Sequence, residues 1–362
     1  MDSVMISSWH SRYLHMAVNG PQTVADFMMF WGLCPLSFLY GLAMRLRSAF
    51  YAAGLKKAYR AGVPVVSVGN LTAGGTGKTP MVDFLAKYLH SRDVRCAIIS
   101  RGYGGNYRQA VGRVTDANGK LQMSPQECGD EPYLLAIRNP GVPVYVAKDR
   151  TFGVQAAEKD GAHLLLLDDA FQHLAVQRDV DIVLLDTKRP FGNGRLLPTG
   201  MLRETTSALQ RADLIVMTRA DAERKPQLSV HAPIVYSRHR LSETITSLNG
   251  EVVSKQAFAG KSCLAFAGIA NPDEFFAALR GFGFADIEAM PLADHQEYNR
   301  EILNRLLGSC HNHDLLVTTE KDAVKLSAVD FPKPCYKVGV ELTFDDLSPL
   351  VNMLDHVMEQ CR

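Results

Sequence analysis

Residues 65–80 read VVSVGNLTAGGTGKTP. The β-branched run at the start of this segment predicts a buried strand, and residues 81–89 behind it have the apolar face of a helix. A strand, a glycine-rich loop and a helix in this order are typical of a phosphate-binding loop, because glycines let backbone N–H groups and the helix N-terminus approach an anion. Only the first glycine of the pattern G-x-x-x-x-G-K-[ST] is missing, where Thr72 stands. The sequence GGTGKT directly behind a strand favours this interpretation over a glycine-rich turn without a ligand.

A phosphate-binding loop gives its residues particular roles. Lys78 would contact the β- and γ-phosphates of a nucleotide, and the Thr79 hydroxyl would hold Mg²⁺. Residues 163–169 read HLLLLDD, an apolar strand that ends in acid, and this pattern predicts that Asp168 reaches the same Mg²⁺. We expect the nucleotide to contact the whole loop and the start of its helix, namely Thr72, Ala73, Gly74, Gly75, Thr76, Gly77, Lys78 and Thr79.

Length and composition limit the class of protein. The chain has 362 residues, more than one typical domain, so we expect two domains. A formal net charge of +1 gives no bulk attraction to nucleic acid, and we expect no nucleic-acid partner. The 7 cysteines are odd in number and form no C-x-x-C pair, which indicates free thiols in a reducing compartment.

An uncharged, aromatic-rich segment covers residues 27–44 and is followed by Arg45, Arg47, Lys56 and Lys57. Its length is at the lower limit of what spans a bilayer, and Pro35 weakens a spanning interpretation. An apolar segment followed by basic residues is typical of a helix that lies in the interface of an anionic leaflet. A helix buried on the core of the protein and a spanning helix are the alternatives.

The remaining pattern predicts an α/β fold. Short apolar runs alternate with helical patterns up to about residue 221, which indicates a P-loop NTPase-like, doubly wound and mostly parallel sheet whose last strand lies within 212–221. Residues 106–128 are polar and predict a loop or hairpin. We expect a membrane-associated helical segment at 1–48, a P-loop domain at 49–225, a β-ribbon linker at 226–259 and a smaller α/β domain at 260–362.

Several polar residues are candidates for the chemistry, each with a plain structural alternative. Asp130 and Glu131 begin a helix, where acidic residues are commonly caps, but a carboxylate there could also act as a base. Arg203 could bind phosphate or form a surface ion pair with Glu204. From the residues alone, His295 is best explained as an ordinary histidine before a helix.

Five stretches together resemble the tetraacyldisaccharide 4′-kinase family, the lipid A 4′-kinases of Gram-negative bacteria. They are residues 67–80, 100–104 (SRGYG), 129–132 (GDEP), 168–173 (DDAFQH) and the 197–204 loop, and the C-terminal stretches 293–295 and 317–323 agree as well. Met201 and Thr205 depart from the prolines that the family often has at these positions, which concerns the shape of the loop rather than the chemistry.

The resemblance implies a kinase that transfers the γ-phosphate of ATP to the 4′-hydroxyl of an acylated disaccharide 1-phosphate, giving lipid IV-A in lipopolysaccharide biosynthesis. It implies that Asp130 acts as the base, assisted by His295, and that closure of the two domains excludes water. The acceptor side would be lined by Glu131, Asp169, Gln172, Arg203 and Glu204. The resemblance also implies a peripheral or monotopic protein on the cytoplasmic face of the inner membrane.

Two other functions compete with this one. A nucleotide-dependent switch or maturation factor would be supported by the TRAD sequence at 218–221, which is similar to a guanine-reading motif. Arg219 replaces the lysine of that motif, and Ala73 stands where related ATPases carry lysine, so both residues argue against it. A soluble small-molecule kinase, with residues 27–44 buried in its core, is the other alternative.

Overall fold

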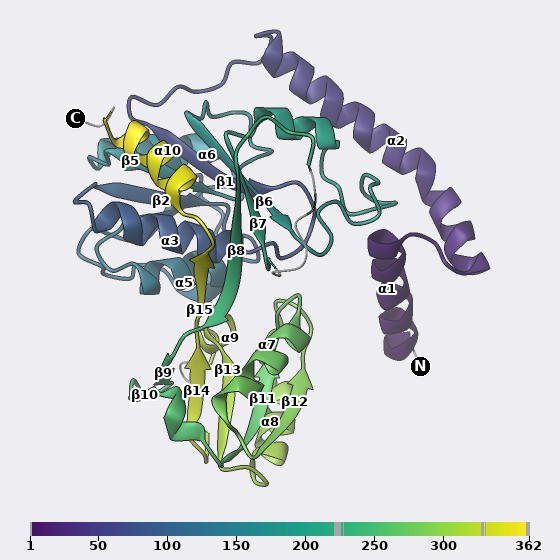
Figure 1. The fold of residues 1–362 in the computed structure, drawn as a ribbon, viewed down its shortest axis with the longest axis vertical. Helices are drawn as coiled ribbons and strands as arrows, with labels where there is room; N and C mark the ends of the chain where they lie inside the picture. Colours follow the sequence, from purple (N-terminus) through teal and green to yellow (C-terminus); the bar gives the residue numbers. More distant parts are fainter. Residues whose placement is uncertain (1, 221–225, 227, 327–328, 330, 360–362) are drawn as a thin grey trace.

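The computed structural model of the chain has two lobes and a helical arm (Figure 1). It describes every residue except 1, 221–225, 227, 327–328, 330 and 360–362. The upper lobe in Figure 1 holds a nine-stranded sheet, the lower lobe holds a six-stranded sheet, and the arm projects from the upper lobe.

The nine-stranded sheet has the order β15-β8-β7-β6-β1-β5-β2-β4-β3. Its strands are β1 (Val65–Asn70), β2 (Cys96–Ser100), β3 (Gly112–Thr115), β4 (Val144–Val146), β5 (Leu164–Asp168), β6 (Val180–Asp186), β7 (Leu214–Thr218), β8 (Ile234–Leu241) and β15 (Val340–Phe344). All neighbours pair in parallel except β3 with β4 and β15 with β8. The residues of β1, β2 and β5 are buried throughout, as expected for central strands covered on both faces.

Helices cover both faces of this sheet, which confirms the predicted doubly wound α/β fold. The helices are α3 (Lys78–His90), α4 (Pro125–Cys128), α5 (Asp130–Arg138) and α6 (Arg150–Lys159), with the 3₁₀ helix η1 (Thr206–Arg211) before β7. Leu85 of α3 packs with Val66 and Val68 of β1, whereas Val154 of α6 packs with Val65 and Leu165 on the opposite face. The alternation of side chains along each strand therefore supplies separate cores on the two faces of the sheet.

The second sheet has the order β10-β9-β14-β13-β11-β12. It consists of β9 (Thr244–Ser247), β10 (Val252–Ser254), β11 (Ser262–Ala267), β12 (Asp286–Pro291), β13 (Leu315–Thr319) and β14 (Cys335–Val338). The helices of this lobe are α7 (Pro272–Leu279), α8 (Arg300–Cys310) and α9 (Glu320–Ala323), with 3₁₀ turns η2 (Lys255–Phe258) and η3 (Arg280–Phe282). The parallel strands β11 and β13 direct their carboxyl ends, and with them α7 and α9, toward the first lobe (Figure 1).

The ends of the two units differ from the sequence-based expectation. The strand predicted within 212–221 is not the last of its sheet, because β8 pairs with β7 and β15 pairs with β8. Within the predicted linker, β8 therefore belongs to the first sheet, while β9 and β10 belong to the second. The C-terminal helix α10 (Ser348–Glu359) also packs into the first lobe, where Leu350 and Leu354 are buried. The boundary at residue 225 lies outside the described residues, and the predicted loop at 106–128 contains β3 and α4.

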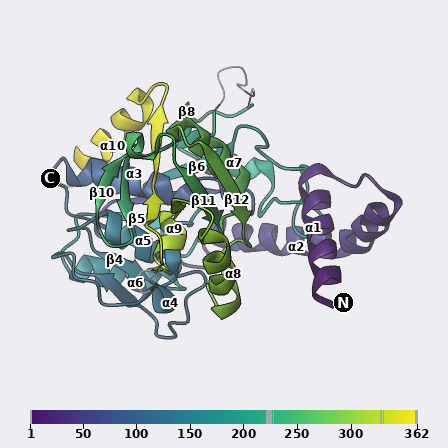
Figure 2. The same cartoon turned by 90° about the horizontal axis from the view of Figure 1, so that it is seen from below.

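The N-terminal arm consists of α1 (Asp2–Asn19) and α2 (Val24–Ala52). Thr23 and Asp26 form a capping box at the start of α2, and Arg12 of α1 donates to Asp26 at 2.8 Å, which joins the two helices. Figures 1 and 2 both show α2 extended along the outside of the first lobe.

Helix α2 is long and apolar enough to cross a membrane, yet only 11% of its most apolar window is buried. Trp31 and Phe38 are 68% and 70% exposed. This exposure argues against the alternative in which residues 27–44 are buried in a soluble core. Large exposed apolar surfaces commonly mark sites of interaction with another protein or a membrane.

Candidate active site

The phosphate loop, residues 71–77, connects the end of β1 to the start of α3. Asn70 Nδ2 donates to Thr76 Oγ1 at 2.9 Å inside the loop, and this buried hydrogen bond fixes its curvature. Gly74 and Gly77 have φ of 109° and 89°. The helix begins at Lys78, so its N-terminus and free N–H groups point at the loop, as an anion site requires.

Two features require glycine at position 77: its positive φ and the close approach of a neighbouring side chain. A Cβ at this position would lie 2.6 Å from Nε2 of His239, which comes from β8. Burial lowers the pKa of His239 to about 4, so its imidazole is neutral beside the loop. The strand that the sequence assigns to a linker therefore forms one wall of the phosphate loop.

Asp168 ends β5 below the loop and is almost fully buried. Ser100 Oγ donates to its Oδ2 at 2.9 Å, whereas its Oδ1 is buried without a hydrogen-bond partner among the described residues. Burial, with added repulsion from Glu131 and Asp169, raises the pKa of Asp168 to about 6. A buried carboxylate with one unsatisfied oxygen is an environment that a cation would stabilise.

Asp169 has a left-handed backbone conformation, with φ of 47°, and its side chain contacts Lys78 at the end of the phosphate loop. Its Oδ1 lies 3.6 Å from Lys78 Nζ and 2.8 Å from Arg203 Nη1. Burial acts to raise the pKa of Asp169, but these two cations outweigh it and hold the pKa below its usual range. Lys78 and Arg203, predicted for opposite sides of the reaction, therefore meet at one carboxylate.

Asp130 and His295 come from different lobes and form a pair. Asp130 is the first residue of α5, and its Oδ2 lies 3.1 Å from His295 Nδ1 and 3.1 Å from Lys325 Nζ. Gly129 precedes it with φ of 92°, where a Cβ would lie 2.4 Å from the carbonyl oxygen of Tyr103. The GDEP sequence therefore needs its glycine to present Asp130 toward the second lobe.

The surroundings of Asp130 and His295 shift the pKa values of both residues. Although burial alone would raise it, the pKa of Asp130 is held well below its usual range by the hydrogen bond to His295 and by the charges of Lys321 and Lys325. The same hydrogen bond raises the pKa of His295. Lys321 Nζ lies 3.2 Å from His295 Nε2 and 3.1 Å from Glu131 Oε1, so both imidazole nitrogens are held. Asp130 is thus an oriented carboxylate that is ionised at neutral pH, as a group must be before it can accept a proton.

A cavity of about 770 Å³ lies between the lobes, and several of these groups line it, although Asp130 and Asp168 do not. The first lobe contributes the phosphate loop with Lys78, Thr79, Glu131, Asp169 and Arg203, and the second lobe contributes Asn271, Glu274, His295 and Lys321. Because both lobes line this cavity, the site is complete only when the two lobes are held together.

Ion pairs hold the lobes together on either side of the cavity. Arg138 of α5 binds Glu320 of α9 at 3.0 Å. On the other side, Arg219 and Lys188 both bind Glu274 of α7, at 2.9 and 2.8 Å. Arg219, offered by the alternative of a guanine-reading motif, is therefore part of an interlobe contact, and Asp221 of that motif lies outside the described residues.

Four predicted site residues serve mainly to build the loop or its surroundings. The Ala73 N–H donates to Met201 O at 2.7 Å, and Thr72 bridges to Leu202 with its side chain buried. Gln172 Nε2 donates to Asn70 O at 2.9 Å. Glu204 is buried and accepts from Arg211 Nη1 at 2.9 Å, and not from its neighbour Arg203.

The sequence alone indicates no role for Lys321 or Lys325, although Lys321 lies in the stretch 317–323 that carries part of the family resemblance. Both residues follow β13, and polar residues just past the carboxyl end of a parallel strand commonly face a binding crevice. Tyr103, whose ring lies 5.5 Å from the ring of His295, carried a similar signal because it follows β2. Arg219 directly follows β7 and carried the same signal, whereas His239 gave none, because nothing local indicates that β8 joins the first sheet.

Comparison with known proteins identifies the relatives of this chain. The model of one family, described as tetraacyldisaccharide-1-P 4′-kinase, matches residues 29–359. The tetraacyldisaccharide 4′-kinase of Syntrophotalea carbinolica is 46% identical over 351 residues, which are 97% of this chain and 98% of that protein. That of Geobacter sulfurreducens is 43% identical over 322 residues, 88% of this chain and 91% of that protein.

The fold is also similar to a solved structure, the "apo" form of LpxK from Aquifex aeolicus in complex with ATP. The two have a TM-score of 0.77 and 30% sequence identity. The match covers 91% of this chain and 99% of that one, so both lobes take part in it.

Proposed function

The chain belongs to the tetraacyldisaccharide-1-P 4′-kinase family, and from this premise we propose how its residues divide the work. The protein is an ATP-dependent kinase that phosphorylates the 4′-hydroxyl of a tetraacyldisaccharide 1-phosphate in lipid A biosynthesis. We propose that the reaction takes place in the cavity between the lobes, with ATP on the phosphate loop and the sugar hydroxyl at Asp130.

One observation carries this proposal: the Asp130 carboxylate is paired with His295 across the two lobes, next to the cavity that the phosphate loop also lines. A cap at a helix start would not need a histidine and two lysines from another lobe. The sugar hydroxyl is a weak nucleophile, and an oriented carboxylate that accepts its proton suits phosphoryl transfer.

In the proposed step, the 4′-oxygen forms a bond to the γ-phosphorus of ATP as the bond from that phosphorus to the β,γ-bridging oxygen breaks. The hydroxyl proton passes to Asp130, and ADP leaves with the electron pair of the broken bond. His295 would orient the carboxylate through their hydrogen bond, and the imidazole is itself held by Lys321.

Lys78 and Arg203 would stabilise the charge on the phosphoryl group during transfer. Both contact Asp169 in the structure, so Asp169 keeps two cations in place at the mouth of the phosphate loop. Preorganised charges of this kind are typically the largest single contribution to such reactions. Glu131, Gln172 and Glu204 would act on the acceptor side, Gln172 and Glu204 by fixing the chain that carries Arg203.

The residues present fit a Mg²⁺ ion. Asp168 has a buried carboxylate oxygen without a hydrogen-bond partner among the described residues, and Thr79 stands in the first turn of α3. We propose that Asp168 and Thr79 hold Mg²⁺. When bound, the ion would neutralise charge on the phosphates of ATP.

We also propose that the protein acts on the cytoplasmic face of the inner membrane. The support is α2, whose exposed apolar side chains are followed by basic residues, a pattern that favours contact with an anionic leaflet. An acceptor with four acyl chains is itself confined to a membrane, so a helix in the interface would bring the cavity to it.

The test is transfer of labelled γ-phosphate from ATP to a tetraacyldisaccharide 1-phosphate in mixed micelles. Lys78→Ala should lower kcat by at least ~100-fold through lost charge stabilisation. Asp130→Asn should lower kcat by about 10²- to 10⁴-fold while ATP affinity stays near normal, because only the proton acceptor is lost.

Each variant has an outcome that would overturn its assignment. Near-normal kcat in Lys78→Ala would exclude the phosphate-loop role of this lysine. A large loss of ATP binding in Asp130→Asn would reassign Asp130 to the nucleotide side. If ATP is consumed without labelled lipid even in the wild-type protein, the switch or maturation-factor function becomes the better explanation.

A further inference from the structure

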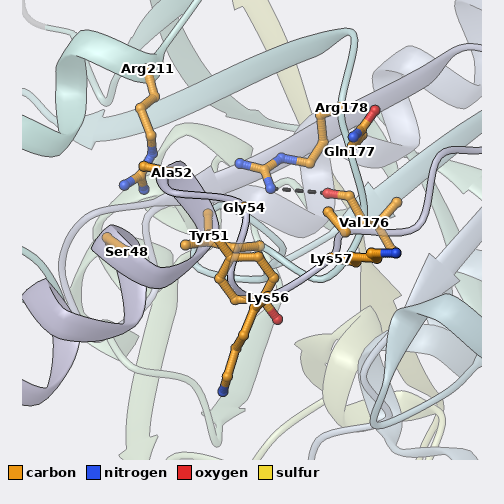
Figure 3. A pocket seen from close by; sticks show the side chains of 12 residues that line it. Ser48, Tyr51, Ala52, Gly54, Lys56, Lys57, Val176, Gln177, Arg178 and Arg211 are labelled. Carbon is orange, nitrogen blue, oxygen red and sulfur yellow. Dashed lines mark hydrogen bonds between the residues drawn. The ribbon is translucent and has the colours of Figure 1, made fainter.

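A second cavity, of about 620 Å³, lies where α2 ends against the first lobe, and its lining is distinct from that of the interlobe cavity (Figure 3). One wall is the end of α2 and the turn behind it, and the other is the chain between β5 and β6. The turn is fixed by backbone hydrogen bonds from Tyr59 N to Ala175 O and from Gln177 N to Tyr59 O, both 2.8 Å. The cavity is therefore built by two segments that are far apart in sequence.

The lining of this cavity is strongly basic. It contains four cations and no carboxylate: Lys56, Lys57, Arg178 and Arg211. Arg178 is already paired with Asp181 at 2.9 Å, and its Nη1 donates to Val176 O at 3.1 Å, the bond drawn in Figure 3. Among the residues that the structure describes, no carboxylate lies within salt-bridge distance of Lys56 or Lys57. The two lysines therefore bring charge that the protein itself does not neutralise.

Arg211 adds hydrogen-bond donors to the same wall. One of its nitrogens, Nη1, donates to Glu204, while Nε and Nη2 are buried and have no hydrogen-bond partner among the described residues. Its guanidinium lies 4.6 Å above the centre of the Phe171 ring, which fixes its plane. A guanidinium held in this way and only partly used is well suited to an anion such as a phosphate.

The surroundings of the cavity indicate that the anion is carried by a lipid. Phe50, near the end of α2, and Leu55, in the turn behind it, are 43% and 74% exposed and are sequence neighbours of lining residues. Apolar groups beside a basic cavity match a molecule that has acyl chains next to a charged head group. A soluble anion would gain nothing from these apolar neighbours.

We propose that the cavity lined by Lys56, Lys57, Arg178 and Arg211 binds the phosphate group of a membrane lipid. The inference rests on the proposed membrane contact of α2. Through the Arg211–Glu204 pair the cavity adjoins the chain that carries Arg203, so an occupied cavity would hold the lipid surface in a fixed position relative to the interlobe site.

The experiment compares partition of the full-length protein onto vesicles of equal surface charge, made anionic either by phosphatidic acid or by oleate in phosphatidylcholine. Wild-type protein should prefer the phosphate-bearing vesicles by roughly tenfold, as expected for one charge-assisted hydrogen bond. Lys56→Gln/Lys57→Gln should lose this preference. Arg45→Gln/Arg60→Gln, which removes the same charge from exposed residues of the same segment outside the cavity, should keep it.

A second variant tests the space in the cavity independently of the charge on its lining. Ala52→Phe places a ring in the cavity without changing any charge, and it should also lose the preference. The proposal is wrong if wild-type protein does not distinguish the two kinds of vesicle, if the two double variants behave alike, or if Ala52→Phe retains the preference.

Turnover in neutral micelles identifies the source of the phosphate. If the cavity holds the 1-phosphate of the acceptor, the lysine double variant should raise KM for the acceptor several-fold. If it holds a bulk phospholipid, KM should be unchanged although the vesicle preference is lost, and either result supports a lipid phosphate. The vesicle measurement needs no turnover, so it remains informative even if the labelled-transfer test of the proposed function fails.

Discussion

At the scale of single residues, the site depends on opposing effects on one carboxylate. Burial would make Asp130 a weaker acid, but His295, Lys321 and Lys325 reverse that effect. The result is a base that stays ionised over the neutral range. Three of these four groups come from the second lobe or follow its strands, so the chemistry of the first lobe is set by the second.

Replacing His295 by alanine should shift the pH dependence of the reaction. The hydrogen bond from His295 lowers the pKa of Asp130 and burial raises it, so the pKa of Asp130 should rise when this hydrogen bond is lost. The acidic limb of kcat/KM should then move to higher pH, by about one unit for a lost charge-assisted interaction. The measurement is a pH profile of acceptor phosphorylation for wild-type protein and His295→Ala.

His239→Ala is the matched control, since it removes a histidine that lines the cavity but contacts neither Asp130 nor its partners in the pairs described above. Its acidic limb should stay where it is in wild-type protein. An unchanged limb in His295→Ala would mean that Asp130 is not the group whose ionisation controls the rate.

The residues on the nucleotide side of the first lobe could be predicted from the sequence because each stands in a local pattern. Lys78 follows glycines behind a strand, and Asp168 ends an apolar strand. His295 could not be assigned from its own neighbours and needed the family resemblance, since its φ of 57° and its partner 165 positions away are invisible in a local pattern. Lys321 and Lys325 do follow a strand, β13, but their contacts with His295 and Asp130 leave no trace in a local pattern.

At the scale of elements, α2 is joined to the loop that carries Arg203. Tyr40 OH donates to Arg203 O at 2.9 Å, and Ser37 Oγ donates to Leu196 O at 3.0 Å. Gly41 is buried against the same loop, where a Cβ would lie 2.7 Å from Leu196 Cδ1. One side of α2 is thus polar or small and docks on the loop, while its exposed side is apolar. The helix therefore links the proposed membrane surface to the acceptor side of the site.

Tyr40→Phe should weaken this link without unfolding the helix. The lost hydrogen bond is worth about 1 kcal/mol, so kcat/KM for the lipid acceptor should fall about fivefold while KM for ATP stays the same. The split between the two substrates is the informative readout, because a general loss of stability would affect both.

Tyr88→Phe provides the comparison, since Tyr88 OH also donates to a distant residue, Asp355, but far from the loop. It should leave both kinetic constants unchanged. Equal effects of Tyr40→Phe on ATP and on the acceptor would exclude a positioning role for Tyr40.

At the scale of the whole molecule, the sequence predicted both α/β sheets but not how the chain passes between them. Strands that alternate with helices were recognised, because each element carries its own period. The assignment of β8 and β15 to the first sheet depends on pairing between residues that are about a hundred positions apart, such as Ser237 with Phe344. Pairing over that distance leaves no local signal, so the local pattern of residues 226–259 predicts only a linker.

The return of the chain has a consequence for stability. Leu354 of α10 is fully buried in the same cluster as Val66 of β1 and Leu85 of α3, although it lies beyond the second lobe in sequence. Leu354→Ala should lower the free energy of unfolding by about 2–5 kcal/mol, the cost of a cavity in a well-packed core. Urea unfolding followed by a probe in the first lobe measures this directly.

Asn352→Ala, at an exposed position of the same helix, should change the stability little. If instead α10 belonged to an independent C-terminal domain, Leu354→Ala would leave the unfolding of the nine-stranded sheet unchanged. Because β15 and α10 close the first sheet after the second lobe has been completed, we expect the two lobes to lose their structure together, and that linkage keeps Asp130 and His295 opposite each other.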